Sequence, residues 1–320
     1  MPLTEIFVMD GDPASDIARW GGRRGSQWGG PSGGNTEAAS EPPDPAGLSA
    51  GPLSLLDVLM SDTDRLRAVH DAYIAAGADI ITMATAPLTP TRLYDLGLES
   101  RLDDLLLTAC GIACAARDAA SREIRVAACL GPLVADTRRY EGPITELIGV
   151  YEYLLHMMAT ESDLIFCTGM TSVREAEAAA LAGAMTGRPV WLCFAVDDSR
   201  PAALAGGEPL ADAIAAVEGL PVDAILLQSA DADRLAPELR RLAPLADTRF
   251  GGRAGVDGDG PAAFPVGPAA APDAYGYWIE DWLDVGASII GGGPATTPAH
   301  TAHARSLIDL RPNAPFRSLL

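Results

Sequence analysis

The chain has 320 residues, of which 48% are hydrophobic, and its 23 basic and 43 acidic residues give a net charge of −20. This charge argues against nucleic acid as a partner, because no basic patch offsets the negative field, and no apolar run reaches the length of a membrane span. All 23 of the basic residues are arginine, and the absence of lysine excludes Schiff-base chemistry and phosphate-binding P-loops.

The N-terminus has no basic segment of the kind that begins a signal peptide. Five cysteines, an odd number, are scattered through apolar segments, so we expect a cytoplasmic protein with reduced thiols. The four histidines fall in segments with helical periodicity. This placement argues against a barrel hydrolase with a histidine-bound metal.

Eight short apolar runs have the length and composition of buried strands. In chain order they are Ile6–Met9, Ala78–Met83, Ile124–Leu130, Leu164–Thr168, Pro189–Val196, Ala224–Gln228, Thr248–Phe250 and Ser288–Gly291. Helical patterns separate them, beginning with Leu55–Ala76, and another follows the last run. Eight alternations of strand and helix predict a single (β/α)₈ TIM barrel, with residues 1–320 in one domain and a flexible Gly/Pro-rich loop at 19–51.

A stretch near the C-terminus combines an apolar run, three glycines and the start of a helix. Ala287–Ile290 is short and β-branched, as in a buried strand, and Gly291–Gly293 allow the backbone to approach a neighbour closely. Thr296 or Thr297 can cap a helix that has Pro298 at its first position. In an α/β barrel this order marks the carboxyl end of a strand, which opens onto the active-site face.

This stretch resembles the last strand of the homocysteine S-methyltransferase family, which reads roughly GA-x-IIGGCC-x-TTP. His70–Thr82 is close to the family's H-x-x-Y-x-x-AGAD-x-I-x-T, and Met9–Asp12 resembles its DGG or DGA after the first strand. Cys129–Pro132 resembles its S-x-GP. The family contains the betaine– and S-methylmethionine–homocysteine methyltransferases and the homocysteine domain of cobalamin-dependent methionine synthase, and the resemblance implies a barrel that acts on a small molecule.

Three cysteines bind zinc in this family, and the zinc activates the homocysteine thiol as a nucleophile. On the resemblance, these positions are Ser229, Gly293 and Pro294, and none of them supplies a thiolate. The family also holds the substrate amino group with a glutamate, in whose place Cys167 stands, followed by Thr168. A neutral thiol cannot pair with an ammonium as a carboxylate does. We therefore expect a divergent member with no cofactor and without the family's zinc.

Two features of the sequence leave alternatives open. Cys129, Cys167 and Cys193 lie on three consecutive predicted strands, and they form either a relocated thiolate site or ordinary buried packing. Asp10 ends the first predicted strand. It serves either as a general base or cation binder at the barrel mouth or as a solvated residue of the following loop.

Two functions follow from these observations. In the first, the chain binds a small amino-acid-like or methylated substrate at the barrel mouth, and any methyl transfer proceeds without the three-cysteine zinc site. In the second, it is a catalytically inactive pseudoenzyme that acts as a binding or scaffold subunit beside an active methyltransferase or a corrinoid protein. A homo-oligomer is compatible with both, and no catalytic residue is assigned. The residues expected to bind substrate are Asp10, Gly11, Thr85, Cys167, Thr168, Gln228, Ser229, Gly292 and Gly293.

Overall fold

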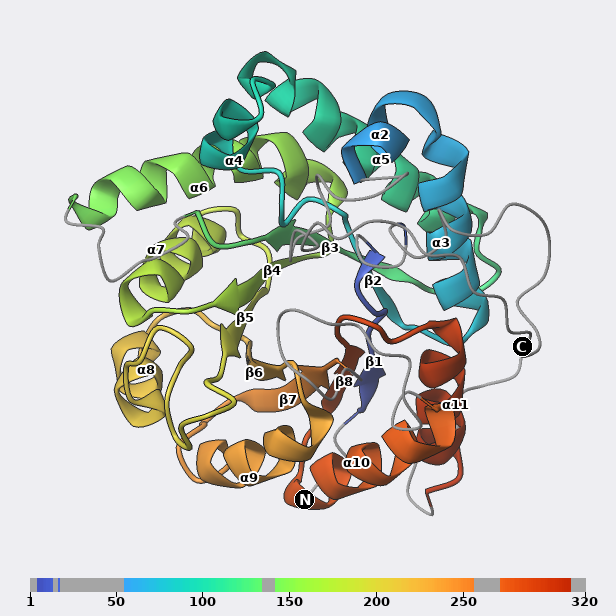
Figure 1. Ribbon diagram of the computed structural model, residues 1–320, viewed down its shortest axis with the longest axis vertical. Coiled ribbons are helices and arrows are strands. Elements are labelled where there is room, and N and C mark those ends of the chain that lie inside the picture. Colours follow the sequence, from blue (N-terminus) through green and yellow to red (C-terminus); the bar gives the residue numbers. More distant parts are fainter. Residues whose placement is uncertain (1–4, 14–16, 18–54, 134–141, 256–270, 312–320) are drawn as a thin grey trace, which may run out of the picture.

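The computed structural model of the chain describes residues 5–13, 17, 55–133, 142–255 and 271–311. Eight parallel strands follow one another around a central ring, and the helices form an outer layer around it (Figure 1). The strands are β1 (Phe7–Val8), β2 (Ile80–Thr82), β3 (Arg125–Leu130), β4 (Leu164–Met170), β5 (Val190–Ala195), β6 (Ala224–Ser229), β7 (Arg249–Ala254) and β8 (Ile289–Gly292).

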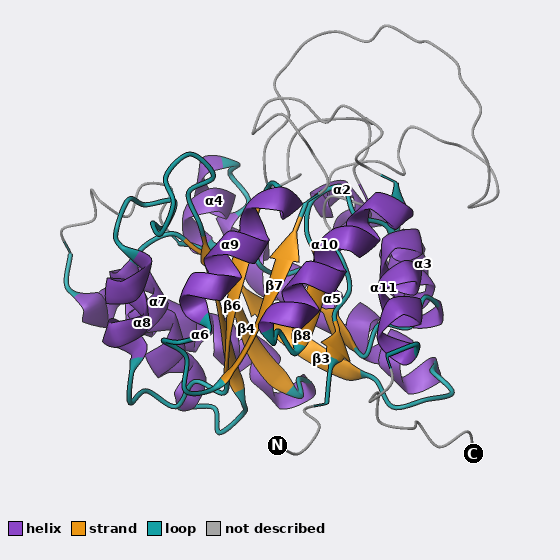
Figure 2. Ribbon diagram, turned by 90° about the horizontal axis from the view of Figure 1, so that it is seen from below, coloured by secondary structure: helices purple, strands orange, loops and turns teal. Residues whose placement is uncertain are grey.

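Helices lie around this ring and cover its outer side (Figure 2). They are α2 (Leu55–Ser61), α3 (Thr63–Ala75), α4 (Pro90–Asp95), α5 (Leu102–Ala119), α6 (Ile144–Met158), α7 (Val173–Ala184), α8 (Leu210–Val217), α9 (Ala232–Leu242), α10 (Pro272–Val285) and α11 (Pro298–Asp309). Short 3₁₀ helices at Glu99–Arg101 and Ala159–Glu161 complete the description. No helix in these residue ranges is long and apolar enough to cross a membrane.

The ring closes between its first and last strands. β1 pairs with β8 in parallel, and the strands from β2 to β8 pair in sequence order. On the remaining side, Met9 forms a parallel bridge with Ile80, and the Asp10 amide donates to the Ile80 carbonyl at 3.0 Å. The structure thus confirms the predicted (β/α)₈ barrel.

Side chains alternate along each strand between the barrel interior and the helix layer. The interior cluster includes Phe7, Phe166, Trp191, Leu226 and Ile289. Their neighbours in sequence belong to the larger cluster that contacts the helices. This alternation decides which residues at the strand ends face the barrel mouth.

Three aspartates at the amino ends of strands hold the preceding odd-numbered strands in place. Asp79 accepts a hydrogen bond from the Val8 amide at 2.9 Å, and Asp163 accepts one from the Val126 amide at 2.8 Å. Asp223 accepts one from an amide of β5 at 2.8 Å. Each aspartate comes directly before an apolar run, so one pattern in the sequence supplies the same anchor three times.

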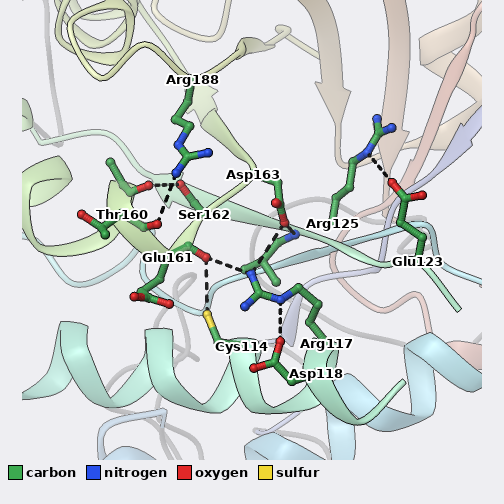
Figure 3. Close-up of polar contacts among 12 residues, drawn as sticks. Cys114, Arg117, Asp118, Glu123, Arg125, Thr160, Glu161, Ser162, Asp163 and Arg188 are labelled. Atoms are coloured by element: carbon green, nitrogen blue, oxygen red, sulfur yellow. Dashed lines mark hydrogen bonds and ion pairs between the residues drawn. The ribbon is translucent and has the colours of Figure 1, made fainter. Parts of the chain in front are cut away.

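Figure 3 shows the contacts around one of these aspartates. Arg117 of α5 donates to the Glu161 carbonyl at 3.2 Å, and the Cys114 thiol contacts the same oxygen at 3.4 Å. Arg117 also lies 3.8 Å from Asp163. Arg188 donates to the carbonyl of Thr160 at 3.3 Å. Arginines of the surrounding helices and loops therefore tie together the amino ends of the central strands.

The sequence located the elements well and their limits less well. The predicted helix Leu55–Ala76 is two helices, α2 and α3, which are separated at Asp62. The seventh strand extends to Ala254 rather than ending at Phe250, and α4 was not predicted. The loop predicted at 19–51 lies outside the described residues. The assignment of residues 1–320 to one domain stays a prediction.

Candidate functional site

A cavity of about 750 Å³ lies at the carboxyl ends of the strands. Residues at the ends of β2, β3, β4, β6 and β7 line it, and α4 contributes one side. In a (β/α)₈ barrel this face carries the active site. The cavity is therefore the candidate functional site of the described part of the chain.

Three polar side chains that contact one another form part of the cavity wall. Arg253 of β7 donates from Nη1 to the Thr168 hydroxyl at 3.0 Å, and this hydroxyl lies 3.2 Å from Oε1 of Gln228. Thr168 ends up in the cavity because it follows Phe166 by two positions on β4, and both side chains point inward. Of the nine residues expected to bind substrate, Thr168 and Gln228 line this cavity.

Arg253 was not among the expected site residues. Its side chain is 7% exposed, and it also donates from Nε to the Gly292 carbonyl at 2.9 Å and from Nη2 to the Gly11 carbonyl at 3.1 Å. The guanidinium lies over the Phe166 ring at 5.5 Å from its centroid. Sequence reasoning missed it because the seventh strand was ended at Phe250. The sequence feature that could have revealed it is an arginine within a run of small residues. It lies four positions after Arg249, so the two side chains share one face of a strand.

Asp10 lies behind the cavity wall. It is 1% exposed, and its carboxyl accepts hydrogen bonds from the Thr82 amide at 2.7 Å and from the Thr82 hydroxyl at 3.0 Å. Burial raises the pKa of Asp10 to about 8, although the Thr82 amide and the charge of Arg253 act in the opposite direction. The group is thus a neutral carboxyl at pH 7 and does not line the cavity, whereas Thr82 does.

The glycines at the mouth allow close backbone packing. A Cβ atom on Gly11 would lie 2.8 Å from the Thr296 hydroxyl oxygen, and one on Gly292 would lie 2.9 Å from the Gly11 Cα. The Thr85 hydroxyl donates to the Cys129 carbonyl at 2.7 Å. Gly11, Thr85 and Gly292 therefore support the loops around the cavity rather than line it.

The three cysteines of consecutive strands do not share one face. Cys129 and Cys193 belong to the barrel interior, whereas Cys167 points into the helix-facing cluster. Burial raises the pKa of the Cys167 thiol to about 12 and that of Cys193 to about 11, so both are neutral thiols. Within the described ranges, no group of three or more His, Cys, Asp or Glu side chains is arranged to hold a metal. These observations favour packing over a relocated thiolate site.

The family's three zinc-ligand positions do come together in space. Gly255 donates its amide to the Ser229 carbonyl at 3.1 Å, and a Cβ on Gly255 would lie 2.8 Å from the Pro294 carbonyl oxygen. Gly293 donates to the Ala254 carbonyl at 2.8 Å. The positions are therefore adjacent, as in a ligand set, although Ser229 and Gly293 do not line the cavity.

The residues at these positions do not fit a zinc ion. Pro294 and Gly293 have no side-chain donor atom. The Ser229 hydroxyl is already bonded to Asp198 Oδ1 at 2.5 Å and to the Asp231 carbonyl at 2.7 Å. A soft-ligand zinc site needs thiolates or imidazoles at these places. Whether another cofactor binds is not tested by these contacts, and the expectation of none stays a prediction.

The fourth position, which the resemblance assigns to the family's glutamate, is Cys167, but the neighbouring residue is the one that faces the cavity. Cys167 is fully buried and faces the helices, whereas Thr168 faces the cavity. The side chain that meets a ligand at the end of β4 is therefore the hydroxyl of Thr168. This hydroxyl is neutral, so it does not offer the carboxylate with which the family binds an ammonium group.

The chain was compared with known families and solved structures. The family described as homocysteine S-methyltransferase matches residues 33–308. The metallated form of the homocysteine methyltransferase MmuM from Escherichia coli is 22% identical, with a TM-score of 0.72, and the match covers 95% of this chain and 96% of that one. Its oxidized form is 23% identical, with a TM-score of 0.72, over 94% and 95% of the two chains. These two structures support the fold.

No curated protein gives a significant match to the sequence. The family match nevertheless spans most of the chain, and it includes all the strands from β2 to β8. It therefore covers the strand ends that form the cavity. The chain belongs to the homocysteine S-methyltransferase family.

Proposed function

We propose that the chain binds a small amino-acid-like or methylated molecule in the barrel-mouth cavity, and that any methyl transfer there proceeds without zinc-bound thiolate chemistry. Family membership supports a methyltransferase-like function with a small-molecule substrate. The observation that carries the proposal is a cavity with polar side chains in its wall, beside three positions, Ser229, Gly293 and Pro294, that carry no thiol and that the resemblance assigns to zinc ligands.

The cavity wall suits an amphipathic ligand. Thr168, Gln228 and Arg253 offer hydrogen-bonding groups, whereas Met83 and Leu133 offer apolar surface. Binding sites for small molecules commonly combine an apolar lining with a few placed polar groups. An amino acid with a thioether or methylated side chain has this same division into a polar and an apolar end.

A second candidate is a pseudoenzyme that binds a ligand or a partner without turnover. It is favoured by the change of all four family positions, at Cys167, Ser229, Gly293 and Pro294. Catalysis requires interactions that strengthen in the transition state, and no replacement for the activating metal is identified at these positions. Binding alone needs only the cavity. A partner methyltransferase or corrinoid protein belongs to this second candidate.

The first experiment measures metal content and turnover on the same preparation. The chain is purified without a metal-affinity step or chelator, its zinc is measured by mass spectrometry, and methyl transfer to L-homocysteine is assayed with S-methylmethionine and with betaine. Binding of L-methionine is measured by calorimetry. We expect less than stoichiometric zinc and measurable binding, and any turnover should persist after treatment with EDTA.

The outcomes separate the two candidates. Binding with EDTA-resistant turnover supports the first, and binding without turnover supports the pseudoenzyme. One zinc per chain with turnover that EDTA abolishes would contradict the proposed loss of zinc chemistry. Failure of every amino-acid ligand to bind would contradict the proposed ligand class.

A further inference from the structure

Arg253 places a buried positive charge in the cavity wall, and its hydrogen bonds go to neutral groups. Its side chain is 7% exposed. Its hydrogen-bond partners are the Thr168 hydroxyl and two backbone carbonyls, all of them neutral. Within the described ranges it forms no ion pair with any carboxylate. A charge removed from water without a counter-charge is costly, so the arrangement is complete only when an anion is present.

The hydrogen-bonding capacity of the side chain leads to the same conclusion. A guanidinium has five N–H groups. One bond from Nε, one from Nη1 and one from Nη2 account for three of them. Each terminal nitrogen therefore keeps a second N–H, and Arg253 lines the cavity. A planar carboxylate matches a pair of parallel N–H donors of this kind.

The groups around Arg253 do not compensate its charge. The Asp10 carboxyl, whose pKa burial raises to about 8, is protonated at neutral pH. Phe166 offers the face of its ring, and the Thr168 hydroxyl is already the acceptor of one of the guanidinium hydrogen bonds. Asp12 and Asp95 also line the cavity. Their carboxylates would favour a ligand that carries an ammonium group as well as an acid group.

We propose that Arg253 is a ligand-binding residue that holds the carboxylate of a small monocarboxylic acid in the cavity. This inference rests on the proposed function and names how the ligand is recognised. Recognition then depends on the carboxylate of the ligand. In the zinc-dependent members of the family, by contrast, the metal holds the sulfur atom of homocysteine. Three hydrogen bonds from Arg253, to β4, to β8 and to the Gly11 carbonyl, fix the guanidinium before the ligand arrives, which reduces the entropy lost on binding.

The test uses pairs of ligands that differ in the charge of one group. Calorimetric titrations compare 4-(methylthio)butanoate with its primary amide, and L-methionine with L-methioninamide. The wild-type chain should bind each carboxylate on the order of 10- to 100-fold more tightly than its amide, which is the usual strength of a charge-assisted pair. This comparison needs no variant, so it holds even where a change at Arg253 disturbs folding.

Three variants assign the preference to the residue. Arg253→Met should abolish the preference for carboxylates, and Arg253→Lys should retain part of it, because a lysine keeps the charge but loses the fork. The matched control is Arg249→Met on the same strand, which removes a side chain that donates to the Glu5 carbonyl outside the cavity. It should leave the preference unchanged. Thermal melts establish that each variant is folded.

The results distinguish this inference from the proposed function. Equal binding of acid and amide would overturn the role of Arg253 and leave the amino-acid pocket in place. An Arg253-dependent preference for 4-(methylthio)butanoate over L-methionine would keep the carboxylate site and overturn the amino-acid class. If none of the four probes binds, the carboxylate site is overturned, because a preformed cationic pocket must then favour no acid.

Discussion

The two ends of the barrel use charge in different ways. At the amino end, Asp79 accepts the Val8 amide at 2.9 Å, and it lies 3.2 Å from Nη1 of Arg305. At the carboxyl end, Arg253 has neutral partners and the neighbouring Asp10 carries a proton at neutral pH. The carboxylates of Asp79 and Asp163 at the amino end are paired with arginines of the chain. At the carboxyl end, Arg253 forms no ion pair within the described residues, which suits a site that binds an anionic ligand.

The protonated state of Asp10 gives the largest expected effect. Its pKa lies near 8 in the folded chain, against an ordinary value of 3.8, so the folded state binds the proton more tightly. The contribution of this group to stability is therefore complete below about pH 4 and declines as the pH rises toward 8, by on the order of 5 kcal/mol at most. Asp10→Asn should remove this decline while keeping an acceptor for Thr82, as measured by denaturation in urea at pH 5 and pH 8.5.

A flat stability profile in the wild-type chain between pH 6.5 and pH 8, where the His70 imidazole no longer contributes a slope, would contradict a neutral Asp10. It would also weaken the comparison between the two ends, because an ionised Asp10 would supply the counter-charge of Arg253. Asp231→Asn is a suitable control, since this aspartate caps α9 at the surface. Its effect should stay small at both pH values.

The paired charges at the amino end give the next largest effect. Asp79→Ala removes the acceptor of the Val8 amide and leaves Arg305, whose side chain is 14% exposed, without this partner. Breaking a buried pair by removing one side costs about 3–5 kcal/mol. Asp223→Ala is the matched control, because Asp223 makes the same kind of backbone bond and has no ion pair within the described ranges.

The control should cost about 1–3 kcal/mol, which is the cost of leaving a buried backbone donor unsatisfied. Guanidinium chloride would mask the charge effect through its ionic strength, so urea is the denaturant to use. Equal losses from the two variants would show that the ion pairs of Asp79 add nothing to the backbone anchor.

His70 lies at neither end of the barrel. Its effect on stability appears in acid, so it must be measured separately from the effects of the charges at the two ends. It is fully buried in α3, and neither ring nitrogen has a hydrogen-bond partner in the described structure. Burial lowers the pKa of His70 from 6.5 to about 4. The unfolded chain therefore binds the proton first, and stability should fall by about 3 kcal/mol as the pH drops from about 6.5 to about 4.

His70→Leu should abolish this loss in acid and leave stability at pH 7.5 within about 1 kcal/mol of wild type, because no hydrogen bond is removed. Melting temperatures at pH 7.5 and pH 4.5 measure both quantities. A variant that loses stability equally at the two pH values would show that the imidazole packs in a way that leucine cannot replace.

The smallest expected effect concerns Gly293, a position that the resemblance assigns to a zinc ligand. A Cβ on Gly293 would lie 2.6 Å from the Ala254 carbonyl carbon and from the Gly255 nitrogen. Gly293→Ala should therefore destabilise the chain by about 1–3 kcal/mol through overpacking. Gly149→Ala in α6, where a Cβ would meet nothing within 4 Å, should stabilise it by about 0.5–1 kcal/mol.

Chemical denaturation of the two glycine variants measures this difference. A neutral Gly293→Ala would mean that the backbone at the mouth can open by a few tenths of an ångström. Cysteine substitution at this position would then be a route to restoring a metal site. A destabilised variant would mean that β7 and the glycine loop now occupy the space of a zinc ligand.

The sequence by itself determined the order of the strands and the family. Apolar runs of strand length and the motifs at His70–Thr82 and Ala287–Pro298 suffice, because each depends on neighbours in the chain. The resemblance of the glycine loop also points to the positions of the zinc ligands, and that assignment stays a prediction. Hydrophobic periodicity does not register a short break, so the division between α2 and α3 at Asp62 was missed.

Only the tertiary structure decided which side chains meet a ligand. A shift of one residue along a strand turns a side chain from the cavity to the helices, and this separates Thr168 from Cys167. Arg253 escaped notice because glycines precede it and the strand has no hydrophobic alternation there. Its burial, its neutral partners and its place in the wall arise from β4, β7, β8 and the Gly11 loop meeting at one point, and that meeting is a property of the closed barrel.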